Sequence, residues 1–559
     1  MRSCGVLMHI TSLPSPYGIG TFGAEAEAFV DWLKSAGQSY WQVLPIGPTG
    51  YGDSPYQSFS TFAGNPLLID LDDLVKSGLI TREKCQAADY GADPTFVDFE
   101  KVTKTKMALL REAFESFDEN VGYVAFIQKE SVWLEDYALF MALKRKHNQC
   151  AWSQWDEQYR LRKPEALDEA REELKSEIDF WKFVQYIFYS QWERLKSYAN
   201  KNGVRLIGDI PIYVAPDSAD VWSNASLFKM DSELKPKCVA GVPPDYFSET
   251  GQLWGNPLYD WEAMKKEKYS WWISRIEKAA QLYDVVRIDH FRAFDTYWSV
   301  PFGEKTAING KWEQGPGMDL WNTVREQLGD VSVIAEDLGD IFDSVKELLK
   351  ASGFPGMRVL QFGFNPESAD NDHLPHNYPT NSVVYTGTHD NSTVLGWYKS
   401  ADSGARAMCR RYLRPLPFEK LNKTFIRELY KSRAGLAIVP MQDIIGLDDR
   451  ARMNIPSTLG GNWKWRATKR QINATGIIAA NMATTGTFEI AREMQKQHLM
   501  SALHKHYSAE DLIHFLKDNA KEFGSNDLLF VSSGVSDADF EKLTRVMDEK
   551  LCANILTYT

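Results

Sequence analysis

Three short, strand-like runs in the middle of the chain each end at an acidic residue, and this pattern restricts the possible folds more than any other feature. The runs are 285–289, 331–336 and 382–390. Each is apolar and rich in β-branched residues, which is typical of a buried strand in a parallel sheet. Helical stretches separate them, as a repeating β/α pattern requires. Because the strands of a parallel barrel all end on one face, we predict that Asp289, Glu336 and Asp390 converge there.

Eight segments of the chain qualify as strands of one parallel sheet. They are residues 5–11, 39–46, 204–214, 284–290, 331–337, 356–363, 382–389 and 436–444. A (β/α)8 barrel takes about 250 residues, and more than about 400 with insertions. The length of 559 residues therefore favours an α/β fold, a (β/α)8 TIM barrel with helical insertion subdomains and a C-terminal extension.

The uneven spacing of these segments predicts where the barrel carries insertions. We predict a catalytic barrel over residues 1–507, with a largely helical insertion at about 65–200 and an active-site loop at about 240–258. In the insertion, apolar side chains recur at helical intervals, which indicates the core of a helical subdomain. These side chains are Trp133, Tyr137, Phe140, Phe180, Trp181, Val184, Ile187 and Phe188.

The predicted active-site loop is rich in glycine and proline and carries Tyr246, Phe247 and Trp254. Loops at this face of a barrel carry function, so we expect this one to cover the cleft. Residues 508–559 form a C-terminal extension, with helix-like stretches on either side of the apolar run 528–531. We expect this run to pack the extension on the outside of the barrel, where it contributes stability rather than catalysis.

The charge balance and the cysteines limit the class of protein. Lys and Arg total 63 and Asp and Glu total 75, so the net charge is −12. Without a basic block, this balance argues against a nucleic-acid or anionic-membrane partner. Six scattered cysteines with no CxxC pair are typical of unbridged thiols in a reducing compartment. A strand-like run begins at Gly5, and no window approaches the roughly 18 apolar residues of a membrane span. We therefore expect a cytoplasmic protein.

Three carboxylates brought together in an apolar site repel one another, so their convergence indicates a catalytic role. In glycoside cleavage one carboxylate attacks the anomeric carbon and a protonated one donates to the leaving oxygen. A third can stabilise the oxocarbenium-like transition state. The alternative is that each acid only caps a helix or binds an arginine. Because Arg287 precedes Asp289 by two residues and His389 adjoins Asp390, we favour catalysis.

A glycine-rich run at 47–52 lacks the Lys-Ser/Thr pair of a phosphate-binding loop. We interpret it as a tight turn that places Ser54, Pro55 and Tyr56 at the cleft. The sequence contains no evident cluster of metal ligands, so we predict neither a metal nor another cofactor.

Ordered motifs extend along most of the chain. They are His9–Pro14, Gly52–Gln57, Gly208–Val214, Leu253–Pro257, Arg287–Arg292, Ala335–Gly339, Gly387–Asn391, Arg452–Thr458 and Asn462–Arg466. Over about residues 3–470 the chain resembles the 4-alpha-glucanotransferases, also called amylomaltases or disproportionating enzymes, which form family 77 of the glycoside hydrolases.

This resemblance orders the roles of the three acids. It implies that Asp289 is the nucleophile, Glu336 the general acid/base and Asp390 the transition-state stabiliser. The neighbouring residues agree, because Arg287 favours an ionised Asp289 and the apolar run before Glu336 favours a protonated one. The resemblance further implies that substrate binds at Tyr56, Asp209, Gln252, Trp254, Arg287, His389 and Asn454, to which the glycine-rich turn adds Ser54.

The expected function is retaining transfer of α-1,4-glucan segments between maltodextrins through a covalent glucosyl-enzyme, with glucose released from short donors. Maltooligosaccharides and α-1,4-glucans are the expected partners. One alternative is a retaining hydrolase of the α-amylase type, in which water is the acceptor. Another is an inactive glucan-binding protein, against which the three intact carboxylates argue.

The chain departs from the family's pattern in two places. Ser457 stands where the family usually has glycine, and a serine costs roughly 1 kcal/mol there if the backbone has positive φ. The extension at 508–559 continues beyond the family's usual end.

Overall fold

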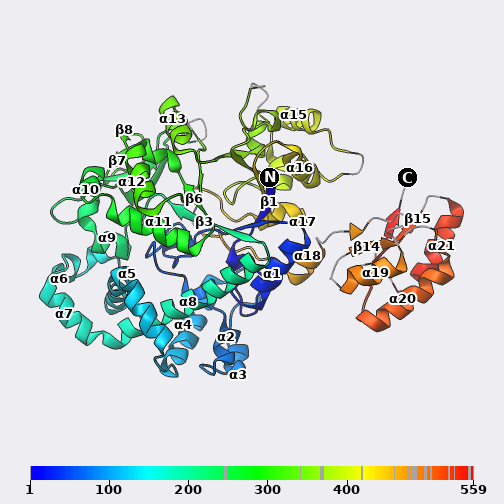
Figure 1. The fold of residues 1–559 in the computed structure, drawn as a ribbon, viewed down its shortest axis with the longest axis horizontal. Coiled ribbons are helices and arrows are strands. Elements are labelled where there is room, and N and C mark those ends of the chain that lie inside the picture. The colour runs from blue at the N-terminus through cyan, green and yellow to red at the C-terminus, as the bar shows by residue number, and fades with distance from the viewer. Residues whose placement is uncertain are drawn as a thin grey trace. The chain divides into compact units, whose positions relative to one another are not determined.

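The computed structural model describes residues 2–244, 248–339, 341–364, 370–416, 419–458, 460–474, 478–479, 487–496, 500–503, 506–526, 529–533, 536–549, 551 and 555–557. The chain forms two compact units, Met1–Arg466 and Ala467–Thr559 (Figure 1). Among the described residues, none belongs to a helix long and apolar enough to cross a membrane.

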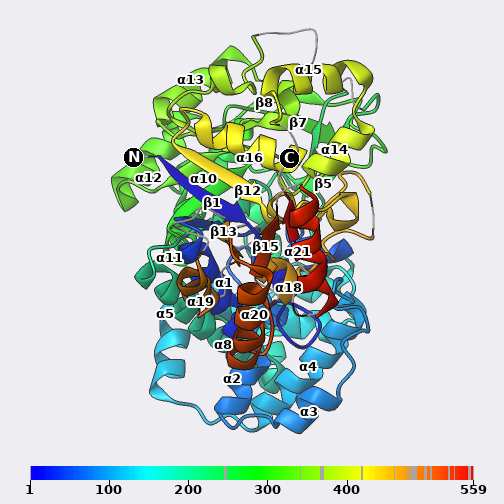
Figure 2. The same ribbon diagram turned by 90° about the vertical axis from the view of Figure 1, so that its right-hand side faces the viewer.

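The first unit is built around a closed barrel of eight parallel strands. They are β1 (Ser3–Leu7), β2 (Tyr40–Gln42), β3 (Arg205–Pro211), β6 (Val285–Asp289), β9 (Val333–Ala335), β10 (Gly356–Val359), β11 (Ser382–Tyr385) and β12 (Leu436–Pro440). Each strand pairs with its neighbours along the chain, and β12 closes the barrel on β1, as Figure 2 shows in yellow and blue. Since all eight lie in or next to the predicted segments, the predicted (β/α)8 fold is confirmed.

Burial explains why these runs form strands. All four residues of β11 are buried, as are the three of β9. In β6 the residues Val285–Ile288 are buried, and Asp289 is the first position that is partly exposed. Strands covered on both faces are largely apolar, and in β6 the terminal Asp289 marks the point where the barrel opens.

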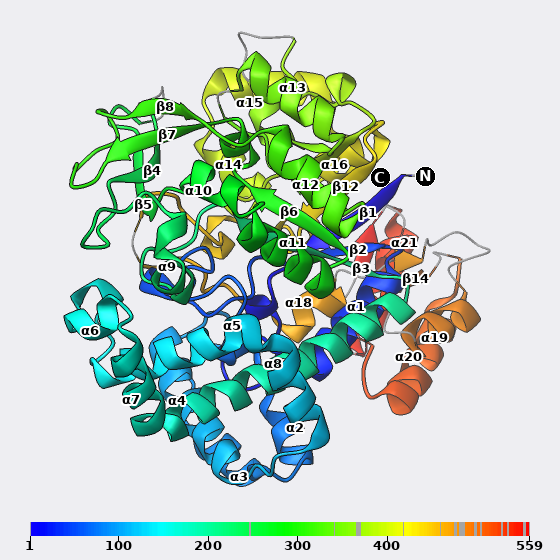
Figure 3. The same ribbon diagram turned by 60° about the vertical axis from the view of Figure 1, so that its left-hand side comes forward.

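Helices cover the outside of the barrel and form the insertion. The helices outside the insertion are α1 (Ala24–Ser35), α9 (Ala219–Ser223), α10 (Trp261–Lys266), α11 (Ser270–Leu282), α12 (Met318–Leu328), α13 (Asp343–Ser352), α14 (Val394–Ser400), α15 (Ser403–Leu413), α16 (Leu421–Lys431) and α17 (Met441–Ile445). The insertion holds α2 (Leu71–Lys76), α3 (Arg82–Ala87), α4 (Phe99–Glu115), α5 (Val121–Lys146), α6 (Glu157–Arg160), α7 (Pro164–Glu173) and α8 (Lys175–Lys201), drawn in blue to cyan in Figure 3.

The predicted aromatic stripe forms the core between α5 and α8. Tyr137 and Phe140 of α5 are buried, as are Phe180 and Phe188 of α8. The rings of Tyr137 and Trp181 meet edge to face with centroids 6.1 Å apart. The helical interpretation of the insertion is therefore correct.

The predicted loop at 240–258 begins and ends in strands of a second sheet. This sheet is antiparallel, in the order β5-β4-β7-β8, with β4 (Cys238–Val242), β5 (Gln252–Pro257), β7 (Thr296–Pro301) and β8 (Lys311–Gln314) (Figure 3). Because β4 pairs with β5 on one side and β7 on the other, its backbone groups are bonded as a strand. Trp254 thus lies on a strand, while Tyr246 and Phe247 lie outside the described residues.

The second unit has a parallel sheet of its own. Its elements are α18 (Lys469–Ala474), β13 (Ile478–Ala479), α19 (Phe488–Lys496), β14 (Met500–Leu503), α20 (Ala509–Phe523), β15 (Leu529–Ser533), α21 (Asp537–Asp548) and β16 (Ile555–Thr557), with strands in the order β13-β14-β15-β16. The two predicted helices are present as α20 and α21, each begun by a capping box at Ser508 or Ser536.

The unit boundary falls ahead of the predicted division at 507/508. Strand β14 precedes residue 508 and pairs with β15, which follows it. Leu503, Leu529 and Val531 share one buried cluster, so both sides of the predicted division belong to one core. Of the apolar run that motivated the prediction, Leu528 lies outside the described residues.

Candidate active site

The predicted acids lie at the carboxyl ends of their strands, the face on which TIM barrels place their active sites. Asp289 ends β6 and Glu336 follows β9 directly. The third run is shorter than predicted, because β11 ends at Tyr385 and Asp390 lies in the loop that follows. There the Asn391 side chain accepts hydrogen bonds from the Thr388 N–H and hydroxyl, at 2.8 and 2.9 Å, which turns the chain so that Asp390 reaches the cleft.

A cleft of about 840 Å³ opens at this face of the barrel. Ligand sites for small molecules typically measure about 300–1,000 Å³. Eight of the predicted site residues line it, namely Ser54, Tyr56, Gln252, Trp254, Asp289, His389, Asp390 and Asn454. The other three, Asp209, Arg287 and Glu336, are buried with exposed fractions of 1, 3 and 8%.

Arg287 links the carboxylates of Asp289 and Asp209 beneath the cleft floor. Its Nη2 donates to Asp289 Oδ1 at 2.9 Å, and its Nη1 donates to both oxygens of Asp209 at 2.7 and 2.6 Å. The Tyr56 hydroxyl donates to Asp209 Oδ2 at 2.8 Å. Asp209 therefore holds Arg287 and Tyr56 in place rather than opening into the cleft.

The Glu336 carboxyl is bound by backbone donors on both oxygens. Oε2 accepts from the His290 N–H at 2.7 Å, and Oε1 accepts from the Leu338 N–H at 2.9 Å. Burial raises the pKa of Glu336 to about 8, and the charge of Asp289 adds to this effect. Arg287 and the two backbone donors oppose the rise without cancelling it. Glu336 is therefore protonated at neutral pH.

The carboxyl group of Asp289 differs from that of Glu336 because it forms an ion pair with the Arg287 guanidinium. Burial and the neighbouring acids raise the pKa of Asp289 above its usual value, and the Arg287 guanidinium limits this rise. The Asp289 side chain is 30% exposed to the cleft, which weakens the effect of burial relative to that on Glu336. Of this pair, Glu336 carries the proton and Asp289 the charge.

Asp390 is the most strongly ionised of the three acids. Asn454 Nδ2 donates to its Oδ1 at 2.6 Å, and His389 Nε2 lies 3.3 Å from its Oδ2. Although burial opposes ionisation, His389 and Asn454 lower the pKa of Asp390 to about 2. The Tyr56 ring stacks on His389, with centroids 5.1 Å apart, and fixes its orientation.

The second sheet reaches the cleft through Trp254. Its ring and the ring of His290 meet edge to face, with centroids 4.8 Å apart and an interplanar angle of 80°. Its Nε1 donates to Gln252 Oε1 at 3.2 Å, so two predicted binding residues on β5 support each other.

Sequence reasoning missed three residues of this site: His290, Arg452 and Trp463. The ring of Trp463 lies near Tyr56 and His389. Arg452 donates to the backbone oxygens of Asp390 and Asn454 and so holds this pair together. All three residues lie inside the motifs quoted above.

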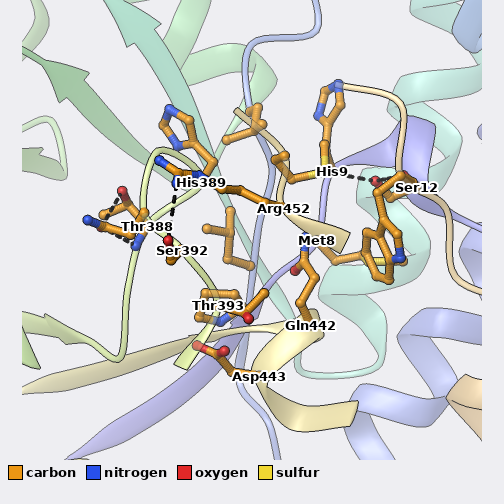
Figure 4. Close-up of a pocket in the computed structure, with 16 residues that line it drawn as sticks. Met8, His9, Ser12, Thr388, His389, Ser392, Thr393, Gln442, Asp443 and Arg452 are labelled. Atoms are coloured by element: carbon orange, nitrogen blue, oxygen red, sulfur yellow. Dashed lines mark hydrogen bonds between the residues drawn. The ribbon is translucent and has the colours of Figure 1, made fainter. Parts of the chain in front are cut away.

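His389 also lines a second, much smaller cavity of about 20 Å³, enough for a single water molecule (Figure 4). In this view Arg452 extends toward the loop that carries His389, and its Nη1 donates to Ser392 Oγ at 3.1 Å. The cavity therefore belongs to the layer that supports His389 and Asp390.

Comparison with known proteins identifies the family. The model of glycoside hydrolase family 77, described as 4-alpha-glucanotransferase, matches residues 8–471. The chain is 49% identical over 464 residues to the 4-alpha-glucanotransferase of Clostridium butyricum, covering 82% of this chain and 95% of that protein. It is 50% identical over 477 residues to that of Streptococcus pneumoniae serotype 4, covering 84% and 94%.

A solved structure gives the same answer. The amylomaltase from Streptococcus agalactiae in complex with acarbose superposes with a TM-score of 0.83 at 43% identity, covering 84% of this chain and 96% of that one. The matches to both relatives and to this structure leave about a sixth of the chain uncovered, and the family match ends close to the start of the second unit. The chain belongs to the 4-alpha-glucanotransferases of glycoside hydrolase family 77.

Proposed function

We propose that the protein is a retaining 4-alpha-glucanotransferase that moves α-1,4-glucan segments between maltooligosaccharides. The observation that carries the proposal is the pairing of a protonated Glu336 with an ionised Asp289 at adjacent strand ends in a cleft of this family. All five cysteines among the described residues are unbridged, which is in keeping with a cytoplasmic enzyme.

The first step forms a covalent glucosyl-enzyme. Arg287 holds Oδ1 of Asp289, and we assign the attack on the anomeric carbon to Oδ2. The bond from that carbon to the bridging oxygen breaks as Glu336 gives its proton to the leaving oxygen. Retention of configuration in this way predicts a separation of about 5–5.5 Å between the carboxyl groups of Asp289 and Glu336.

The second step returns the proton. Glu336, now ionised, takes the proton of the 4-hydroxyl of an incoming glucan, whose oxygen attacks the anomeric carbon and releases Asp289. Asp390, ionised beside His389, stabilises the positive charge that develops on the sugar ring in both transition states. The released reducing-side sugar is glucose when the donor is short.

Transfer requires that a sugar hydroxyl react in preference to water. The acceptor must be held in line, where its effective molarity can exceed that of bulk water. Trp254, Gln252 and the exposed Leu253 of β5 line the cleft, and we assign them to the acceptor side, where they also limit access of water.

Incubation with maltotriose tests this function. A 4-alpha-glucanotransferase gives glucose and a ladder of longer maltodextrins at a constant number of reducing ends. A hydrolase increases the number of reducing ends and gives no longer products, and an inactive glucan-binding protein leaves maltotriose unchanged. Asp289→Asn serves as the matched control, because the proposed chemistry requires this carboxylate and the variant should form no product.

A further inference from the structure

His290, the residue that follows Asp289, has a left-handed backbone with φ 55° and ψ 46°. Residues with a β-carbon rarely adopt this conformation, which glycine and asparagine take more readily. A single-turn 3-10 helix, η6 (Phe291–Phe294), begins immediately after it. The chain therefore keeps a disfavoured conformation next to its predicted nucleophile, and such positions are often functional.

This conformation turns two successive backbone donors onto Glu336. The His290 N–H donates to Glu336 Oε2 at 2.7 Å, and the Phe291 N–H donates to the Glu336 backbone oxygen at 3.0 Å. A left-handed residue followed by a right-handed one brings neighbouring N–H groups to the same side of the chain, and here they bond a side-chain and a backbone oxygen of the same residue. With an extended backbone at His290, the two N–H groups would point in different directions.

The imidazole ring of His290 has a separate environment. It lines the cleft and meets the Trp254 ring edge to face, with centroids 4.8 Å apart. Burial and Arg292 lower the pKa of His290 to about 3, so the ring is neutral. It therefore exerts no charge on Glu336, and the backbone alone connects His290 to that carboxyl.

We propose that His290 is a positioning residue for the general acid/base, and that its left-handed backbone aims an N–H at Oε2 of Glu336 and so fixes the orientation of that carboxyl. The proposal rests on the role given to Glu336 in the proposed function. Beyond this N–H, the groups that face the carboxyl are the Leu338 N–H, the charged Asp289 and the charged Arg287.

Loss of this donor has two expected effects. The donor favours the ionised carboxyl, so without it the pKa of Glu336 rises and the basic limb of the kcat profile moves to higher pH. The carboxyl also gains rotational freedom, so kcat falls while KM stays within a few-fold. A residue that only supported packing would lower the melting temperature without moving the basic limb.

A series of substitutions at position 290 separates the backbone from the ring. His290→Gly and His290→Asn remove the ring but adopt the left-handed conformation readily, whereas His290→Ala resists it and the β-branched His290→Val resists it most. We expect the Gly and Asn variants to keep the basic limb at its wild-type position and to lose less kcat than the Ala variant. The Ala and Val variants should move the limb upward in that order and lose about 10-fold or more in kcat.

The series still tests the proposal if one variant folds poorly. If His290→Val does not fold, the comparison of His290→Gly with His290→Ala remains. Equal losses in Gly and Ala, or an unmoved limb in both Ala and Val, would overturn the proposal and leave the ring as the only contribution. Glu336→Gln is measured alongside. Normal turnover in Glu336→Gln would contradict the proposed function. If Glu336→Gln instead loses turnover, while the substitutions at position 290 leave the basic limb and kcat unchanged, only this inference is refuted.

Discussion

Arg287 and Asp289, both on β6 and two residues apart, form an ion pair of 2.9 Å at the floor of the cleft. Residues i and i+2 of a strand point to the same face, so this spacing directs the guanidinium and the carboxylate into the barrel interior together. Asp209 on the neighbouring strand holds the other side of the guanidinium, and the guanidinium favours the ionised form of Asp289.

Asp289→Asn should abolish transfer while leaving maltodextrin binding nearly intact, because only the covalent step needs the carboxylate. The amide cannot form the glucosyl-enzyme but has nearly the same shape. Turnover on maltotriose and the affinity for a maltodextrin, measured by calorimetry, check the two parts. Near-normal turnover in this variant would end the assignment of the nucleophile.

The basic limb of kcat/KM should lie near pH 8 and belong to Glu336. As a group that must be protonated in the first step, it supports activity below its pKa, and activity falls as pH rises through that value. Asp289 and Asp390 must be ionised, and burial raises the pKa of Asp289 while that of Asp390 is about 2, so the acidic limb belongs to Asp289. A pH profile measured on the wild type reports both limbs.

Glu336→Gln should lower turnover by about 10²–10⁴-fold and remove that basic limb. Added azide should partly restore cleavage of a substrate with a good leaving group, because such a substrate needs no acid and azide needs no base. A rate like that of the wild type on a poor leaving group, without azide rescue, would place the acid role on another residue.

Trp254→Ala should raise the ratio of hydrolysis to transfer as well as lower total activity. The ring lies on β5 at the cleft and against His290, where it limits access of water. New reducing ends measured against glucose released from maltotriose give the ratio. Phe302→Ala, at an aromatic residue that is 55% exposed and does not line the cleft, is the matched control. An unchanged ratio of hydrolysis to transfer in Trp254→Ala would show that Trp254 contributes only packing.

Ser457→Gly should stabilise the folded protein by about 1 kcal/mol. Ser457 has φ 62°, so the left-handed conformation considered from the sequence is present, and glycine adopts it without the steric cost of a β-carbon. Denaturant unfolding measures the change. Ser116→Gly is the control, because Ser116 has φ −98° and should show no gain.

Removal of the second unit should leave the chemistry in place. A chain of residues 1–474 keeps the whole segment that matches the family, and we expect transfer activity within a few-fold of the full chain. A chain of residues 1–507 instead retains β14 without its partner β15 and should be less soluble. Loss of turnover in a stable 1–474 chain would assign the second unit a part in catalysis.

The sequence by itself determined the barrel and the acids at its strand ends. Continuous β-branched runs can be buried only as strands covered on both faces, and the acidic residue that ends each of two runs marks the mouth of the barrel. The turn with Ser54 and Tyr56 and the helical insertion followed from equally local patterns. These features depend on neighbours in the chain, so they can be predicted without the fold.

Only the tertiary structure decided how the acids are supported. Tyr56 and Asp209 are 153 residues apart and Asp390 and Asn454 are 64 apart, yet each pair shares a hydrogen bond. The strand character of β4 depends on its pairing with β7. Between these two strands the chain passes through β6, which ends at Asp289. The backbone donors to Glu336 likewise come from a neighbouring strand end as well as its own loop. Contacts of this kind leave no periodic trace in the sequence, because the barrel alone brings the partners together.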